Sequence, residues 1–543
     1  MVKKKEQQAP MLRNYFNTLD YNINKFGEKT ILLWQCGGFY EVYALKNEDK
    51  KDFERGKLQI ETVNEICNFS IVAKGKQMFD NLRLFMAGIP TTADMERIIE
   101  KLKNEGFTIV LFGEIGDDPI SKGKIREQLG IFSPGTHFNL DSKKISNNIM
   151  CIWLEERKVN FLNKVPFVIM GMSCIDIFTG KSSLYQYSKK GNKLHNPTTF
   201  DDLSRFFSIY NPEELIFIYN YENEDKIEDI IQFASLYSTK TYKINLNKKE
   251  TELQNEANQF EKQTYQEKIL NKFYKIKDYG GFMEITNLAN YYIGCKSFCF
   301  LLNFIYCHNP SLVYNIHKPV FENSSNKLIL ANHSLHQLNI VETHQDKGKY
   351  SSLQKFLNKC ITPMGKRRFN DLLVHPTTDE IYLNKEYDIV DYLLNDYDEF
   401  FEIRKQLSKI RDIERLYRKI ILNKVLPCEI AQFYYNMETI INIDKNLSKH
   451  EKLRDYINGN IKIDINKNCK EVMNYIKKYM NLEASLAVNN VKGEINFMNR
   501  GNFKHLDKAD TEHTEINKIL QSIRKYFSNL IKTNKKQQKN KNI

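Results

Sequence analysis

The pentapeptide Gly37–Glu41 places an aromatic ring and a carboxylate two residues apart, directly after two glycines. On a β-strand, residues i and i+2 project from the same face about 6.5–7 Å apart. Phe39 and Glu41 would then lie side by side, which is an unusual pair for a surface, while Tyr40 faces the other way. The alternative interpretation is an ordinary strand leaving a turn, with Phe39 in the core and Glu41 in solvent. The pentapeptide alone leaves both interpretations open.

Two groups of basic side chains are candidates for phosphate contacts. Lys74 and Lys76 flank a glycine, and the alternative is a pair of lysines on a solvated loop. Arg500, Lys504 and Lys508 form a second candidate group, for which a charged helical face is the usual explanation. The net charge of +13 is compatible with a polyanionic partner, but part of this excess positive charge comes from lysines at the two ends of the chain. The charge by itself therefore does not establish such a partner.

Motifs of catalysis and nucleotide binding are missing from the sequence. It contains no GxxxxGK[ST], GxGxxG, HExxH, GxSxG or HRD motif. The 10 cysteines form no CxxC pair, which argues against a zinc ribbon or a thioredoxin-type site. We therefore expect a binding protein, not an enzyme, with no metal site and with cysteines that stay reduced.

Hydrophobic patterning gives no indication of a membrane protein. The longest apolar stretches, residues 165–178 and 298–307, are shorter than the roughly 20 residues of a membrane-spanning helix. The N-terminal residues lack the apolar segment of a secretory signal. We therefore expect an intracellular protein with no membrane partner.

Three successive patterns must position these candidate residues. Up to about residue 145, strand-like segments at 30–35 and 39–43 are followed by helical periodicity over 91–105, with Thr91 and Thr92 as N-caps. From 149 to about 275, three strands precede alternating helices and strands. From about 279 onward a β-like piece at Lys327–Leu330 interrupts predicted helices over 285–306, 351–373, 378–394, 397–406, 427–441, 472–481 and 514–531. The fold class expected is multidomain, with α+β and α/β parts followed by a mostly α part.

Several short motifs, in order along the chain, resemble those of the MutS family of DNA mismatch-repair proteins. Gly37–Glu41 resembles the family's GDFYE element, and Met86–Pro90 resembles its MAGVP segment. Asp176–Gly180 resembles a D-x-x-TG motif, and Thr362–Arg367 resembles T-x-MG-x-R. The motif residues expected to have structural roles are Gly37, Gly38, Tyr40, Met86, Gly88, Pro90, Asp176, Gly180, Gly365 and Arg367.

The resemblance implies a division of the chain into domains. It implies a mixed mismatch-recognition domain, a ribonuclease-H-like connector, a long-helix lever domain and the start of a clamp, followed by a basic tail that we expect to be disordered. The corresponding residues are 1–140, 147–275, 279–495, 496–531 and 532–543. A ribonuclease-H-like fold does not by itself confer nuclease chemistry.

The resemblance also implies the function, which is binding of mismatched double-stranded DNA in DNA repair. Phe39 would be an apolar wedge inserted at a mispaired step, which kinks and unstacks more easily than a paired one. Glu41 would accept a hydrogen bond from the displaced base. Its charge would penalise binding wherever no base is available to it, because a carboxylate near phosphates is repulsive. The other partners implied are a second copy of the chain and a MutL-like protein.

Two departures from the family pattern leave alternatives open. Gly38 stands where the family has Asp, which would loosen the turn. The family's ATPase domain has no counterpart in this sequence, so ATP and Mg²⁺ would be cofactors of the missing domain only, and the clamp would be truncated. The alternatives are the DNA-binding half of a split ATPase with a separately encoded partner, and a basic helical nucleic-acid scaffold without mismatch specificity.

Overall fold

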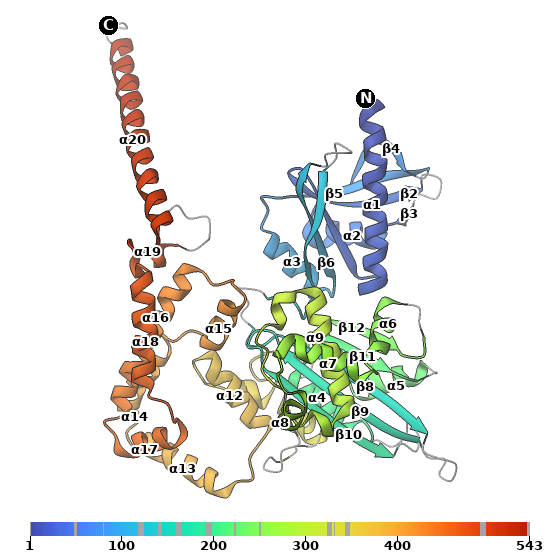
Figure 1. Cartoon of the computed structure of the whole chain (residues 1–543), viewed down its shortest axis with the longest axis vertical. Helices are drawn as coiled ribbons and strands as arrows, with labels where there is room; N and C mark the ends of the chain where they lie inside the picture. The colour runs from blue at the N-terminus through green and yellow to red at the C-terminus, as the bar shows by residue number, and fades with distance from the viewer. Residues whose placement is uncertain are drawn as a thin grey trace. The chain divides into compact units, whose positions relative to one another are not determined.

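The chain folds into two compact units, Met1–Glu380 and Ile381–Ile543. The computed structural model describes residues 2–47, 52–79, 81–117, 124–138, 144–158, 166–190, 198–221, 224–248, 251–322, 328, 330, 332–342, 348–488 and 496–539. The first unit combines two β-sheets with helices, and the second is helical (Figure 1). The predicted order, a mixed α/β part followed by a mostly helical part, is confirmed.

The first sheet has the strand order β4-β5-β2-β1-β6-β7, with β3 beside β2. β1 and β6 run parallel, and the other neighbouring pairs run antiparallel. The strands are β1 (Thr30–Cys36), β2 (Phe39–Asn47), β3 (Asp52–Arg55), β4 (Val72–Phe79), β5 (Leu82–Pro90), β6 (Thr108–Asp117) and β7 (Lys124–Phe132).

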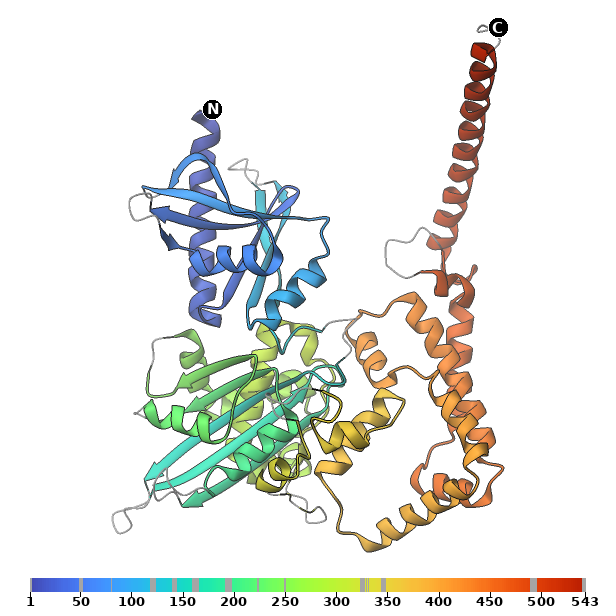
Figure 2. The same cartoon turned by 180° about the vertical axis from the view of Figure 1, so that it is seen from behind.

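Helices cover both faces of the first sheet (Figures 1 and 2). Successive strand residues point to opposite faces, so Leu32 packs with α1 (Val2–Phe26) while Ile31 packs with α2 (Lys57–Cys67) and α3 (Met95–Asn104). The sequence analysis did not anticipate α1. It also placed the cap of α3 at Thr91 or Thr92, whereas Asp94 caps the helix by accepting the Arg97 N–H.

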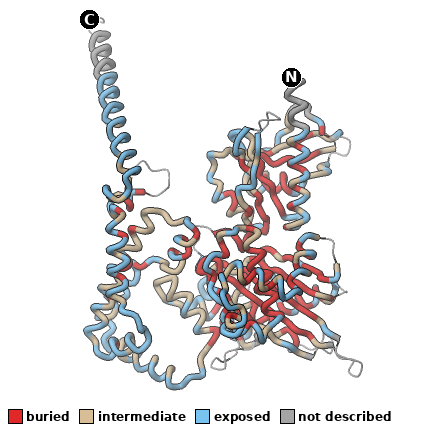
Figure 3. The backbone as a smooth tube through the Cα atoms, in the orientation of Figure 1, coloured by how far each residue is buried: buried red, intermediate tan, exposed pale blue. Residues whose placement is uncertain are grey.

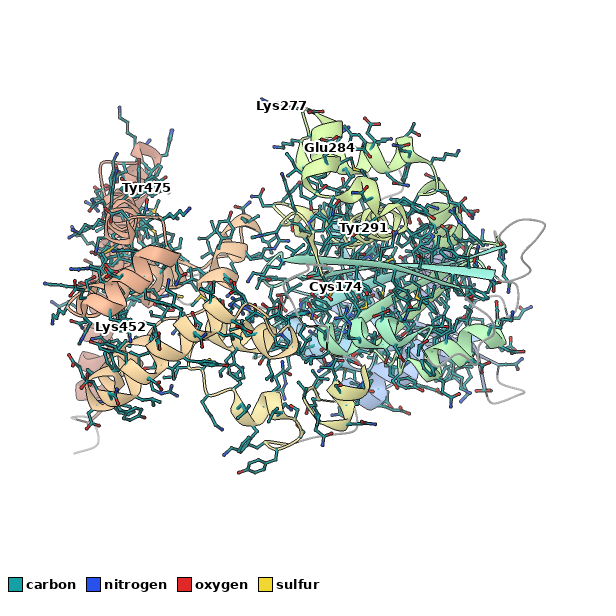
Figure 4. The ribbon with its side chains drawn as sticks, turned by 90° about the horizontal axis from the view of Figure 1, so that it is seen from below. Cys174, Lys277, Glu284, Tyr291, Lys452 and Tyr475 are labelled. Atoms are coloured by element: carbon teal, nitrogen blue, oxygen red, sulfur yellow. The ribbon has the colours of Figure 1, made fainter. Side chains whose placement is uncertain are left out.

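The second sheet has the order β12-β11-β8-β9-β10-β13. β8 to β10 form an antiparallel meander, and β11 and β12 follow parallel to β8. One face packs on α9 (Figure 1), and the other carries α4 and α5 (Figure 2). Cys174 of β9 belongs to the core on the α4 and α5 side (Figure 4). The elements are β8 (Asn148–Lys158), β9 (Pro166–Asp176), β10 (Ser182–Lys190), α4 (Asp201–Tyr210), β11 (Glu214–Tyr219), α5 (Asp225–Phe233), β12 (Lys240–Asn245), α9 (Tyr292–His308) and β13 (Val320–Phe321).

Shorter helices complete the first unit. They are α6 (Glu252–Gln259), α7 (Gln263–Tyr274), α8 (Tyr279–Ile285), η1 (Leu288–Asn290), η2 (Pro310–Val313), α10 (Asn332–Gln337), α11 (Leu353–Leu357) and α12 (Pro363–Val374). The helix predicted over 351–373 is in fact two helices, because Thr362 caps a new helix whose first residue is Pro363. Of the β-like piece at Lys327–Leu330, residues 328 and 330 are described and lie outside any strand.

The second unit consists of helices with much exposed surface (Figure 3). The helix predicted over 514–531 is longer at both ends, because α20 begins at Lys504 and ends at Lys539. It therefore includes residues 532–539 of the tail that we expected to be disordered. No helix in the described parts of the chain has the length and hydropathy needed to cross a membrane. The helices are α13 (Glu380–Asn395), α14 (Tyr397–Leu407), α15 (Ile413–Ile421), α16 (Pro427–Leu447), α17 (Glu451–Asn460), α18 (Ile465–Tyr479), α19 (Leu482–Ala487) and α20 (Lys504–Lys539).

Candidate nucleic-acid interface

The candidate site is the tip of the β1–β2 hairpin. Cys36 pairs with Phe39 across a two-residue turn made by Gly37 and Gly38. Gly37 has φ +61°, in the left-handed region that glycine adopts at little cost. A Cβ on either glycine would find no atom within 4 Å, so the turn is a bare stretch of backbone open on its outer side.

Side chains from two other segments hold this turn. The Gly37 N–H donates to Glu114 Oε1 at 3.2 Å, and Glu114 is paired with Arg126 at 2.7 Å. The Gly38 carbonyl accepts the backbone N–H of Thr91 at 2.9 Å and its hydroxyl at 3.2 Å. Gly38 is therefore held by Thr91 from the end of β5, although it lacks the side chain that the family's Asp would supply.

Phe39 and Glu41 have the reverse of the ordinary burial pattern. Phe39 is 48% exposed, whereas Glu41 is only 7% exposed. The interpretation with Phe39 in the core and Glu41 in solvent is therefore wrong. The structure instead presents an aromatic ring to solvent beside a carboxylate that is largely covered.

The ring of Phe39 lies over a gap in the neighbouring strand. Phe39 pairs with Pro90 in register, and a Cβ on Gly88 would lie 3.5 Å from Phe39 Cδ1 and 3.6 Å from Met86 Cε. Gly88 thus leaves room for the ring to rest against β5. Tyr40 faces the opposite side of the sheet, where it packs against the core that contains α2 and α3.

Glu41 is held by two donors on a single oxygen. Lys74 Nζ lies 2.7 Å from Glu41 Oε2, and the Tyr43 hydroxyl donates to the same oxygen. Lys74 Nζ also lies 3.2 Å from the Tyr43 hydroxyl oxygen. Lys74, predicted as a phosphate contact, is therefore an ion-pair partner of Glu41 in this structure. The side chain of Lys76 lies outside the described residues.

Tyr43 links this cluster to the core. Its backbone N–H donates to the Tyr15 hydroxyl of α1 at 3.1 Å, and its own hydroxyl lies 3.4 Å from the Cys36 sulfur. Burial raises the pKa of Tyr43 far above its usual value, with the nearby Cys36 and Glu41 adding to the effect. The phenol therefore remains a proton donor at any physiological pH.

The remaining basic candidates lie in the second unit, where two of them have acidic neighbours. Arg500 is paired with Asp510 at the start of α20. Lys508 Nζ lies 3.8 Å from Glu512 Oε1, one turn further along the same helix. Lys504 is the first residue of α20 and is exposed.

The motif around Asp176 closes the turn between β9 and β10. Asp176 accepts the backbone N–H of Asn147 at 2.9 Å and of Phe178 at 3.1 Å, and the Thr179 hydroxyl at 2.7 Å. Gly180 has φ +74°, which the turn requires. Burial raises the pKa of Asp176 although these donors oppose the shift. The geometry assigns this motif to turn formation.

Gly365 and Arg367 belong to the first turns of α12. The Gly365 N–H donates to the capping hydroxyl of Thr362 at 3.1 Å, and a Cβ on Gly365 would lie 2.9 Å from that oxygen. Arg367 Nη1 donates to the Ile145 carbonyl at 3.1 Å. Gly365 therefore takes part in the cap of α12, and Arg367 links this helix to the backbone at Ile145.

The structure adds residues that the sequence analysis missed. Tyr43 continues the period-two face of Phe39 and Glu41, so strand alternation was a signal for it. Tyr15, Glu114 and Arg126 carry no local signal, because their contacts with the hairpin depend on the sheet. Among the described residues, no group of three or more His, Cys, Asp or Glu could hold a metal ion.

Known proteins with similar sequences match nearly the whole chain. A family description, MutS domain III, matches residues 333–537. A putative DNA mismatch repair protein mutS homolog of Acanthamoeba polyphaga mimivirus is 26% identical over 97% of this chain and 47% of its own length. DNA mismatch repair protein MutS of Caldanaerobacter subterraneus is 24% identical over 81% of this chain and 44% of its own length. The resemblance to MutS is confirmed.

The MutS proteins that match are much longer than this chain. A third relative, MutS of Petrotoga mobilis, is 22% identical over 97% of this chain and 57% of its own length. The chain thus spans about half the length of the curated relatives it matches. The expectation that the protein is not an enzyme is wrong, because its relatives are MutS proteins, a family of ATPases. The absence of catalytic and nucleotide-binding motifs applies only to the sequence given, which aligns with about half of each of these MutS proteins.

Proposed function

We propose that this chain binds mismatched double-stranded DNA and that Phe39 is the wedge that tests a base step. The observation that carries the proposal is the 48% exposure of Phe39 at the tip of a braced hairpin, directly in front of a covered carboxylate. The backbone around Phe39 is held on both sides, so the ring is presented in the way that a side chain inserted between base steps requires. Insertion between bases would supply the apolar surroundings that the ring lacks in the free protein.

A wedge needs a rigid support and a narrow tip. Glu114 and Thr91 fix the two glycines of the turn through hydrogen bonds of 3.2 and 2.9 Å. The absence of side chains at Gly37 and Gly38 lets the backbone approach a groove closely. A mispaired step costs less to unstack than a paired step, where unstacking costs about a few kcal/mol. The free-energy difference between the two steps gives mismatch preference without any base-specific code.

Glu41 would then accept a hydrogen bond from the base displaced by the ring. It lies on the same face of β2 as Phe39, because residues i and i+2 of a strand share a face. A carboxylate in this place is repelled by phosphates, so a duplex that offers no displaced base gains nothing from it.

We further propose the domain roles implied by the family, with recognition over 1–140, a ribonuclease-H-like connector over 147–275, a lever over 279–495 and the beginning of a clamp over 496–531. A second copy of the chain and a MutL-like protein remain predicted partners.

The test is a competition binding experiment with the full chain. A fluorescent duplex with one central mispair is displaced by unlabelled duplexes of the same sequence, either mispaired or fully paired, at moderate salt. We expect the mispaired competitor to be the more effective of the two. Equal competition by both duplexes would refute mismatch recognition and support the nucleic-acid scaffold without mismatch specificity.

A further inference from the structure

Two side chains from different strands converge on one oxygen of Glu41. Lys74 comes from β4 and reaches past β5 to the Glu41 carboxylate on β2. Its Nζ lies 2.7 Å from Oε2, where the Tyr43 hydroxyl also donates. Among the described residues, the two donors bind Oε2 and none binds Oε1, so Oε1 keeps its capacity to accept a hydrogen bond.

This cluster is fixed from behind. Lys74 Nζ lies 4.9 Å from the centre of the Tyr43 ring, and the Tyr43 backbone N–H is bound to the Tyr15 hydroxyl at 3.1 Å. The side chains of Lys74 and Glu41 are 25% and 10% exposed, so water only partly screens their attraction. The carboxylate therefore has a defined position before any ligand arrives.

We propose that Lys74 and Tyr43 are positioning residues that set the Glu41 carboxylate for a displaced base. They hold Oε2, Lys74 offsets part of the negative charge, and Oε1 is left as the acceptor for an N–H group of the base. This inference rests on the proposed function. It gives Lys74 a role through Glu41 in place of the direct phosphate contact predicted from the sequence.

The geometry favours this role over a phosphate contact. If Lys74 turned away to a phosphate, the largely covered Glu41 carboxylate would lose its cationic partner, and an unpaired charge in a covered position is costly. The Tyr43 hydroxyl alone would then hold the carboxylate. DNA binding is therefore more favourable when the Lys74–Glu41 pair stays intact.

A double-mutant cycle separates the two roles. The Kd values for mispaired and paired duplexes are measured for the wild type, Lys74→Met, Glu41→Gln and the double variant, with Lys74→Arg to test rescue. Lys46→Met is the matched control, because Lys46 lies over the Phe53 ring at 5.3 Å on the other face of β2. Circular dichroism and thermal melting confirm that each variant is folded.

We expect Lys74→Met to weaken binding of the mispaired duplex about tenfold, within the usual range of coupled neighbouring residues. It should change binding of the paired duplex little and have no further effect in the Glu41→Gln background. Lys74→Arg should restore part of the preference, and Lys46→Met should retain it. Tyr43→Phe, which removes only the hydroxyl, should also lower the preference.

Other outcomes overturn the inference. Equal loss for both duplexes, in both backgrounds, with a salt dependence lowered by about 0.9 per lost contact, would make Lys74 a phosphate contact. An unchanged preference in Lys74→Met would show that Glu41 needs no partner. A wild type without any preference would refute the proposed function itself, which distinguishes that failure from failure of the positioning role.

Discussion

Replacing Phe39 by alanine is the most direct perturbation of the proposed wedge. An aromatic side chain buries about 150–250 Å² when fully covered. Because 48% of Phe39 is exposed, about 100 Å² remains to be buried on insertion. At roughly 25 cal/mol per Å², this area corresponds to about 2.5 kcal/mol, or about 70-fold in affinity. Phe39→Ala should therefore lower the preference for mispaired duplex by up to about this factor.

The assay is the same competition experiment, repeated at several salt concentrations. The affinity for the paired duplex and its salt dependence should stay unchanged, because the wedge inserts only where a base step unstacks easily. The covered part of the ring rests on Gly88, so some stability is lost as well, but less than the roughly 3–5 kcal/mol of a core Phe→Ala change. Urea unfolding measures that loss separately from binding.

Phe233→Ala is the matched control, because Phe233 is 46% exposed on α5, away from the hairpin. It should leave the preference unchanged. The wedge assignment is refuted if Phe39→Ala discriminates as well as the wild type, or if Phe233→Ala loses as much preference. A loss of affinity for both duplexes together with a lowered melting temperature would instead indicate unfolding.

Two further predictions concern the framework. Gly171→Ala would place a Cβ 2.4 Å from the backbone N of Gly294, so we expect the free energy of unfolding, measured in urea, to fall by at least about 2–3 kcal/mol. Gly116→Ala is the control and should lower it far less, because a Cβ there would have no atom within 4 Å. Burial in an aromatic pocket lowers the pKa of His308 to about 3, and its Nδ1–H bond to the Phe304 carbonyl only partly opposes this shift. The neutral ring should contribute its full stabilisation above the unfolded pKa near 6.5. This stabilisation should be lost as the pH falls towards 3, and by pH 4 the loss in free energy of unfolding should be roughly 3 kcal/mol. His308→Leu should show a shallower acid loss in urea titrations, and an unchanged slope would contradict the buried neutral ring.

Local patterns in the sequence were sufficient for many elements. The apolar run before Gly37 and the alternation after Gly38 predicted both strands of the hairpin, because side chains of a strand alternate between the faces of a sheet. The helix α1 was missed, because its lysine-rich beginning resembles a solvated terminus. Its apolar residues are buried only by packing against the first sheet, which the local sequence does not reveal. The break between α11 and α12 was missed because apolar spacing continues through it, while the Thr362 cap and Pro363 decide where the new helix begins.

The candidate site divides in the same way. The sequence by itself determined which residues form the hairpin tip, because glycines, an aromatic ring and a carboxylate follow one another along a few residues of chain. Only the tertiary structure decided their environments. Whether Phe39 is exposed and Glu41 covered depends on what lies across the sheet, and Gly88, Lys74 and Tyr15 come from segments far away in sequence. Burial and the pairing of charges are properties of groups brought together by folding, so local spacing cannot specify them.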